Sequence, residues 1–204
     1  MTKAKKRVGI MGGTFDPIHI GHLVIAEAAR ETLGLSQVIF IPAAQPPHKT
    51  GRKVAAAEHR LRLTQLAVEG NPHFCALDLE MRREGPSYSY DTLRALVEEH
   101  GESTDFYFIV GGDELDTIFT WHRVSELFSL CHFAAAKRKG SPIRLDDVRE
   151  LLGEEVLARI HPVNTPELEI SSTDIRRRLR EGRSIRYLVP EKVEACIYKE
   201  GLYS

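Results

Sequence analysis

Two histidines and three glycines lie close together in the segment 12–22, which reads GGTFDPIHIGH. His19 and His22 are three residues apart, so on a helix that begins here both imidazoles can face one side, near the positive end of the helix dipole. Glycine leaves the backbone open to close approach by a ligand, and Thr14 adds a hydroxyl group. Imidazoles and unpaired amides at a helix start can bind a polyphosphate. An isolated pair of histidines is more often solvated, but the position of this pair directly after a predicted strand favours a phosphate site.

A second segment with phosphate-binding chemistry covers residues 170–176 and reads ISSTDIR. Ser171 or Ser172 is a favourable N-cap, and Asp174 falls in the first turn of the helix that follows. Amides of that turn can receive an anion, and Arg176 offers a fork of donors to a phosphate group. Taken alone, the segment also fits a capped surface helix with solvated arginines. Together with the first loop, it favours a nucleotide site.

Regular structure must position these segments, and the hydrophobic pattern predicts strands that alternate with helices. Short apolar runs predict strands at residues 8–11, 38–41, 74–77, 106–110, 132–136 and 159–163. Apolar residues at helical spacing predict helices at residues 21–33, 59–68, 91–99, 172–180 and 190–199. The pattern predicts a Rossmann-like, doubly wound α/β fold: a mainly parallel sheet with helices on both faces and a helical C-terminal part.

We predict a single domain over residues 1–204, because the sequence contains no linker, internal repeat or low-complexity tract. Its length suffices for one sizeable hydrophobic core. In parallel α/β sheets, ligands bind beyond the carboxyl ends of the strands. In this chain those places follow Met11, Ile41 and Val110, and the first of them is the loop with the two histidines.

Composition and charge exclude several classes of protein. The formal net charge is -1, so no overall field favours nucleic acid or an acidic membrane, and no apolar run approaches the length of a membrane span. Cys75, Cys131 and Cys196 are far apart, which argues against a disulfide framework or a zinc ribbon and predicts a cytoplasmic protein. The dinucleotide motif GxGxxG does not follow the first strand, and the P-loop motif GxxxxGK[ST] is absent from the sequence.

The two phosphate-binding segments resemble the signatures of the nucleotidyltransferase superfamily that carries an HxGH motif. Between them the chain is similar, over nearly its whole length, to the nicotinate-nucleotide adenylyltransferases of bacterial NAD synthesis. This resemblance rests on PPHK at 46–49, REGPSYSYDTL at 83–93, GGD at 111–113, Trp121, and GLY at 201–203.

The resemblance implies a set of site residues. Those expected to bind ATP are Gly12, Gly13, Thr14, Phe15, Gly21, Gly111, Asp113, Ile170, Ser171, Ser172 and Ile175, with His19, His22 and Arg176 as catalytic groups. Those expected to bind the acceptor are Lys49, Tyr88, Ser89, Trp121 and Arg138. Asp113 suits a ribose, because a carboxylate accepts from two adjacent hydroxyls, and Trp121 is expected to stack on the nicotinate ring. Ser89 stands where members often have threonine, and it keeps the hydroxyl.

The reaction that the resemblance implies is direct attack by the phosphate of nicotinate mononucleotide on the α-phosphorus of ATP. Catalysis then consists of alignment and neutralisation of charge on the leaving pyrophosphate. Mg²⁺ is expected to be carried on the ATP phosphates, without a dedicated metal site in the protein. ATP and nicotinate mononucleotide are the expected partners, nucleic acid and membranes are not, and a homo-oligomer is compatible with the sequence.

Alternative functions remain open at this point. Within the superfamily, the acceptor could be nicotinamide mononucleotide or phosphopantetheine. A non-catalytic nucleotide sensor has no use for the cations at 19, 22 and 176, and a metallohydrolase is disfavoured because the nine histidines form no HExxH motif. The segment 43–57 contains glycine and lysines and is a candidate substrate-ordered lid, whereas segment 139–155 matches no known role.

Overall fold

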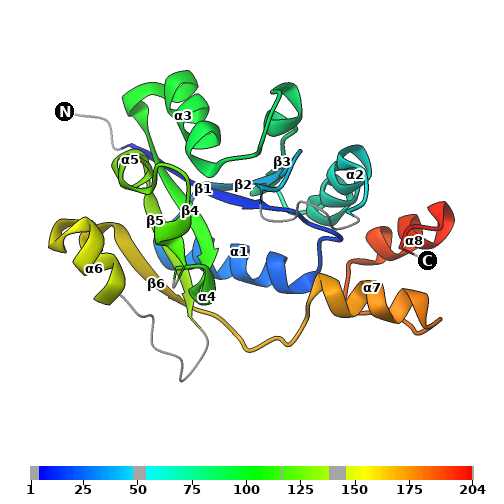
Figure 1. The fold of residues 1–204 in the computed structure, drawn as a ribbon. Helices are drawn as coiled ribbons and strands as arrows, with labels where there is room; N and C mark the ends of the chain where they lie inside the picture. The colour runs from blue at the N-terminus through cyan, green and yellow to red at the C-terminus, as the bar shows by residue number, and fades with distance from the viewer. Residues whose placement is uncertain (1–4, 48–53, 116, 138–145, 204) are drawn as a thin grey trace. The chain divides into compact units, whose positions relative to one another are not determined.

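The computed structural model describes residues 5–47, 54–115, 117–137 and 146–203 (Figure 1). Its strands are β1 (Lys6–Gly13), β2 (Gln37–Pro42), β3 (Phe74–Ala76), β4 (Thr104–Gly111), β5 (His132–Lys137) and β6 (Ile160–Asn164). Its α-helices are α1 (Ile20–Leu33), α2 (Ala57–Val68), α3 (Ser89–His100), α4 (Gly112–Leu115), α5 (Val124–Leu130), α6 (Asp146–Leu152), α7 (Ser172–Arg180) and α8 (Glu191–Glu200). Short 3-10 turns complete the elements; those used below are η2 (Leu79–Arg82), η4 (Ile118–Thr120) and η5 (Glu154–Arg159).

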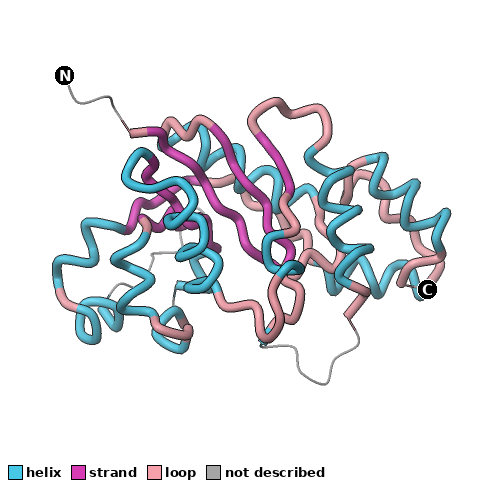
Figure 2. Tube along the Cα trace, turned by 90° about the horizontal axis from the view of Figure 1, so that it is seen from above, coloured by secondary structure: helices cyan, strands magenta, loops and turns pink. Residues whose placement is uncertain are grey.

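The strands of the described residues form one sheet in the order β3-β2-β1-β4-β5-β6. β1 pairs in parallel with β4, β4 with β5, and β5 with β6. Strand order reverses direction between β1 and β4, and such a reversal is where doubly wound sheets bind ligands. Figure 2 draws the strands in magenta. The predicted α/β fold with a parallel sheet is confirmed.

By internal contacts, the chain divides into two compact units. Unit 1 comprises residues 1–11, 25–38 and 88–167, and unit 2 comprises residues 12–24, 39–87 and 168–204. Strands β1 and β2 and helix α1 each pass from one unit to the other. The prediction of a single domain remains a prediction.

Unit 1 is built around β4 and β5, whose consecutive apolar residues are buried on both faces of the sheet, as expected for internal parallel strands. Helices α3 and α5 lie side by side on one face, and the second half of α1 lies on the other (Figure 1). Gly9 in β1 permits this close packing, because an added Cβ atom would lie 2.9 Å from Leu35 Cδ1 and 3.1 Å from Ile109 Cδ1.

Unit 2 contains the loop after β1 and the helices α2, α7 and α8. Helix α2 packs against α8 and β3, and its buried side chains, Arg60, Leu63, Thr64 and Val68, form one stripe at helical spacing. At the end of α8, Glu200 Oε1 pairs with Arg62 Nη1 at 2.7 Å, and Glu200 Oε2 lies 3.2 Å from His59 Nδ1. Helix α8 ends at Gly201, which adopts the left-handed conformation at φ 60°.

Sequence patterning located each predicted strand and helix to within about two residues, the usual uncertainty at element ends. It missed α4, α5 and α6, which span seven residues or fewer, and the 3-10 turns. The segment 139–155, which matched no role, contains α6 and the start of η5, and its residues 139–145 lie outside the described ranges. No helix among the described residues is long and apolar enough to cross a membrane.

Candidate active site

In unit 2, the loop after β1 brings His19 and His22 into direct contact. Their rings stack with centroids 3.7 Å apart and an interplanar angle of 24°. The backbone N–H of His19 donates to His22 Nδ1 at 3.2 Å, so a neutral His22 ring carries its proton on Nε2. Phe15 meets the His22 ring edge-on at 5.1 Å and is itself buried at 3 % exposure. The predicted pairing of the two histidines on one side of the helix start is therefore seen in the structure.

Two glycines of this loop make room for neighbouring rings. A Cβ atom on Gly13 would lie 3.0 Å from the Phe15 ring, and one on Gly21 would lie 3.0 Å from His19 Nδ1. Phe15 adopts a positive φ of 48°, a conformation that costs free energy in a non-glycine residue and that occurs often at functional sites. The ring of His19 thus fills the space beside Gly21, the space that the sequence suggested a ligand would use.

The first turn of α1 presents fewer open amides than the sequence suggested. The N–H of Ile20 donates to the carbonyl of Leu188 at 2.9 Å, and the N–H of His22 donates to the carbonyl of His19 at 3.0 Å. The N–H of His19 is held by His22 Nδ1. Because these three donors already have acceptors, the imidazoles are the groups of this segment that could still bind an anion.

The segment at the start of α7 lies in the same unit and contacts the same loop. Ser171 is the N-cap, and its hydroxyl accepts the N–H of Asp174 at 3.1 Å, as predicted. Ser172 Oγ donates to the carbonyl of Pro17 at 2.9 Å. Ile170 lies near Gly21, at 3.9 Å from the position that a Cβ atom would take there, and Ile175 is fully buried. The structure thus joins the two segments that the sequence identified separately.

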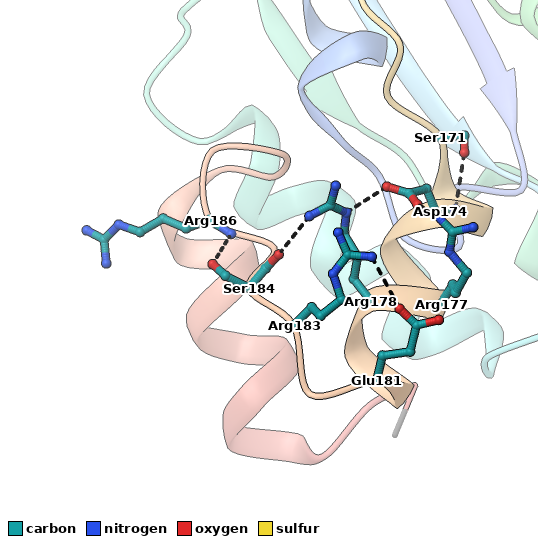
Figure 3. Close-up of polar contacts among 8 residues, drawn as sticks. All are labelled: Ser171, Asp174, Arg177, Arg178, Glu181, Arg183, Ser184 and Arg186. Carbon is teal, nitrogen blue, oxygen red and sulfur yellow. Dashed lines mark hydrogen bonds and ion pairs between the residues drawn. The ribbon is translucent and has the colours of Figure 1, made fainter.

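The arginines of α7 differ in their partners. Arg177 and Arg178 both pair with the carboxylate of Asp174, the latter at 2.7 Å (Figure 3). Arg176 instead turns to the loop after β1: its Nη1 donates to the Asp16 carbonyl at 2.6 Å and lies 3.5 Å from Asp16 Oδ2. Among these three arginines, Arg176 is therefore the one that contacts the loop after β1, which contains His19.

Sequence reasoning missed a buried polar cluster behind this loop, made of Asp16, Arg60 and Tyr203. Asp16 is 2 % exposed and Arg60 is 1 % exposed, although both types of side chain are charged at neutral pH. The buried hydroxyl of Tyr203 lies beside Asp16. Two effects raise the pKa of Tyr203: burial, which is the larger, and the negative charge of the Asp16 carboxylate. One signal was present in the sequence: Arg60 falls on the buried stripe of α2, where an apolar residue is the usual choice.

Burial determines the charge of His19. Its side chain is 7 % exposed, and desolvation lowers its pKa from 6.5 to about 4. Its buried Nδ1 has no hydrogen-bond partner among the described residues. In the free protein at neutral pH, His19 is consequently a neutral ring that can donate or accept a hydrogen bond, and the cationic role that its residue type suggested is not available to it.

Three of the predicted acceptor-binding residues lie in unit 1, at the start of α3 and after η4. Tyr88 is the N-cap of α3 and stacks on His122, with ring centroids 4.3 Å apart, and Ser89 is the first helical residue. Trp121 is half-buried and meets Phe108 edge-on at 5.8 Å. The sequence pattern gave no role to His122, which follows Trp121 directly.

The remaining predicted residues lie at the end of β4, in α4 and outside the described ranges. Gly111 ends β4, and its N–H donates to Glu114 Oε2 at 2.8 Å. Asp113 belongs to α4, but its side chain is not among the described atoms, and Lys49 and Arg138 lie outside the described ranges. Within those ranges, no group of three or more His, Cys, Asp or Glu side chains is arranged to hold a metal ion.

Fold and site together define a nucleotide-binding α/β protein of the nucleotidyltransferase class. The sequence profile of the cytidylyltransferase-like family matches residues 10–178, a span that includes both the segment 12–22 and the segment 170–176. One relative, from Moorella thermoacetica, is 49 % identical over 198 residues, which cover 97 % of this chain and 91 % of the relative. A second, from Desulfitobacterium hafniense strain Y51, is 48 % identical over 199 residues, which cover 97 % and 96 %. Both carry the name "Probable nicotinate-nucleotide adenylyltransferase".

Solved structures give the same fold. A Plasmodium falciparum nicotinic acid mononucleotide adenylyltransferase complexed with NaAD aligns with a TM-score of 0.76 at 22 % identity, over 97 % of each chain. The same enzyme complexed with APC gives a TM-score of 0.74. The chain belongs to the cytidylyltransferase-like family and, within it, to the nicotinate-nucleotide adenylyltransferases.

The state of His19 gives a direct prediction for the free protein. We expect its imidazole to stay neutral on acidification to about pH 4. This pKa lies below the value of 6.5 in the unfolded chain, so between about pH 6.5 and 4 the unfolded chain binds a proton that the folded protein does not. The free energy of unfolding should therefore fall as the pH drops through this range. Nitrogen-detected NMR titration of the histidine rings, with His19→Gln for assignment, measures the pKa. Titration of the His19 ring near pH 6.5 would contradict the burial seen here.

Proposed function

We propose that this chain transfers the AMP part of MgATP to nicotinate mononucleotide and releases pyrophosphate, so that nicotinate adenine dinucleotide is formed for NAD biosynthesis. The observation that carries the proposal is the near-full-length identity of 49 % to a nicotinate-nucleotide adenylyltransferase. The stacked His19 and His22 support it together with Arg176, which is held against Asp16 of the same loop, because these groups suit the phosphates of a nucleotide. The cysteines of the described residues are free thiols, which suits a reducing, cytoplasmic compartment.

In the proposed reaction, a phosphate oxygen of nicotinate mononucleotide attacks the α-phosphorus of ATP in line with the leaving group. A new P–O bond forms, the bond from the α-phosphorus to the α,β-bridging oxygen breaks, and its electron pair leaves with pyrophosphate. The nucleophile is already an anion, so no general base is needed. The protein then contributes alignment and charge neutralisation.

The residue roles follow from the charges of the free protein. His22 and neutral His19 donate hydrogen bonds to the triphosphate, and Arg176 supplies positive charge to the β,γ end together with the first amides of α7. Gly12, Gly13, Thr14 and Phe15 form the backbone of the same site, and Mg²⁺ enters on the ATP phosphates with its own waters.

The acceptor side is proposed for residues of unit 1 and for residues outside the described ranges. Trp121 stacks on the nicotinate ring, and the N-terminal amides of α3 at Tyr88 and Ser89 receive its carboxylate. Lys49 and Arg138 bind the acceptor phosphate. Gly111 and Asp113 contact the nucleoside part of ATP.

The function is tested by pyrophosphate release from MgATP with nicotinate mononucleotide, nicotinamide mononucleotide and phosphopantetheine as parallel acceptors. We expect nicotinate mononucleotide to be strongly preferred, since a positively polarised helix start favours a carboxylate over an amide. Preference for either other acceptor would retain adenylyl transfer and overturn the acceptor site. Release with none of the three, from protein shown to bind ATP, would overturn the proposal in favour of a nucleotide sensor.

The role of His22 predicts a large loss of rate. His22→Ala should lower kcat by roughly 100- to 1,000-fold, the usual effect of removing one group that stabilises charge in a transition state. His73→Ala, which alters an exposed histidine of the same unit, is the matched control and should retain the wild-type kcat. A folded His22→Ala protein with wild-type turnover would remove His22 from the mechanism.

The role of Trp121 predicts a selective effect on the acceptor. Trp121→Ala should raise the KM for nicotinate mononucleotide by about 5- to 150-fold, the range of one base–aromatic stack, and change the KM for ATP much less. Phe119→Ala, at an exposed aromatic of η4, serves as the control. Equal changes in both KM values would instead assign Trp121 to the packing against Phe108.

A further inference from the structure

Arg60 is the largest fully buried side chain in the described residues, and its contacts are unusual for an arginine. Its Nε donates to the Ala55 carbonyl at 2.9 Å, its Nη1 to the Thr14 carbonyl at 2.7 Å, and its Nη2 to the Ala44 carbonyl at 3.3 Å. The three acceptors come from three irregular segments of unit 2: the loop after β1, the residues after β2, and the residues before α2. One side chain therefore joins three loops.

The geometry explains why this residue is arginine. Backbone carbonyl groups that face the protein interior need donors, and Thr14, Ala44 and Ala55 lie outside the strands and helices whose regular hydrogen bonds would supply them. The guanidinium holds its donors in a rigid planar fork that reaches several acceptors at once, whereas the lysine ammonium concentrates its donors at one point. Burial lowers the pKa of Arg60, and the Asp16 carboxylate opposes that shift, so the cation is retained at a cost in desolvation.

Asp16 extends the same set of contacts to Arg176. Its Oδ1 accepts the N–H of Ala55 at 3.2 Å, so Ala55 is held on its carbonyl side by Arg60 and on its amide side by Asp16. The Asp16 carbonyl in turn accepts from Arg176 Nη1 at 2.6 Å. A continuous chain of hydrogen bonds runs from the buried face of α2 to the arginine that we assign to the phosphates.

We propose that Arg60 is a positioning residue for adenylyl transfer: its guanidinium fixes the loop of His19 and His22 and, through Ala55 and Asp16, the side chain of Arg176. Arg60 makes its contacts from the buried face of α2 and acts through these groups. A displacement of about 1 Å in a reacting arrangement can cost about 100-fold in rate. Loss of the fork should therefore lower kcat more than it weakens the binding of either substrate. This inference rests on the proposed function.

The test compares Arg60→Lys and Arg60→Met with the matched variants Arg62→Lys and Arg62→Met. Arg62 lies two residues along the same helix, is 58 % exposed and pairs with Glu200, so its variants control for a changed charge on α2. For each protein, kcat and both KM values are measured by pyrophosphate release with MgATP and nicotinate mononucleotide. Thermal unfolding monitors the folded fraction at the assay temperature.

We expect both Arg60 variants to lose about 10- to 100-fold in kcat while they remain folded, with KM changes of less than about 5-fold, and the Arg62 variants to match the wild type. A supporting result is partial rescue of Arg60→Met by millimolar methylguanidinium, with no rescue of His22→Ala. Folded Arg60 variants with wild-type kcat would overturn the inference. Failure of both Arg60 variants to fold would also overturn it, because Arg60 would then serve general stability. A wild-type protein without activity would instead overturn the proposed function.

Discussion

The part of the structure that carries the proposed phosphate site depends on hydrogen bonds between the buried Arg60 side chain and carbonyl groups of irregular backbone. Thr14, Ala44 and Ala55 lie outside the strands and helices, and the guanidinium of Arg60 donates hydrogen bonds to their carbonyl oxygens. An unsatisfied buried polar group costs about 1–3 kcal/mol, so the buried guanidinium of Arg60 needs these three acceptors in a domain of ordinary stability. The buried cation has its own cost, which the Asp16 carboxylate offsets in part. The loop after β1 can therefore stay irregular and still be held in one conformation.

This arrangement also determines where positive charge is available. The charge of Arg60 is enclosed, His19 is neutral because it is buried, and Arg177 and Arg178 pair with Asp174. Arg176 is held against the loop of His19 and His22 by the Asp16 carbonyl, and the Asp16 carboxylate 3.5 Å away offsets part of its charge. With a formal net charge of -1, the chain has no overall positive field, so any phosphate binding depends on locally placed donors and cations.

The sheet could be predicted from sequence because its strands are nearly continuous apolar runs. Val38 to Ile41 and Phe106 to Val110 are buried on both faces, and uninterrupted runs of this kind are typical of internal parallel strands. The short helices α5 and α6 could not be predicted, since one or two turns carry little periodicity, and α5 begins after Arg123 in a left-handed conformation that favours no particular sequence signal. Local contacts could be predicted too, because the Ser171 cap and the contact between His19 and His22 follow from the spacing of these residues along the chain.

The tertiary contacts of the site could not be predicted from the sequence, and the glycines show why. Gly13 and Gly21 suggested space for a ligand, yet in the structure the rings of Phe15 and His19 occupy the space where a Cβ atom would lie. A sequence shows that a position is small, but it does not show which neighbour requires this. The same limit applies to Arg60, whose partners are 5, 16 and 46 residues away along the chain. The glycines of this loop are therefore required by neighbouring side chains of the loop itself. The contacts that the loop can make with a substrate depend on this internal packing.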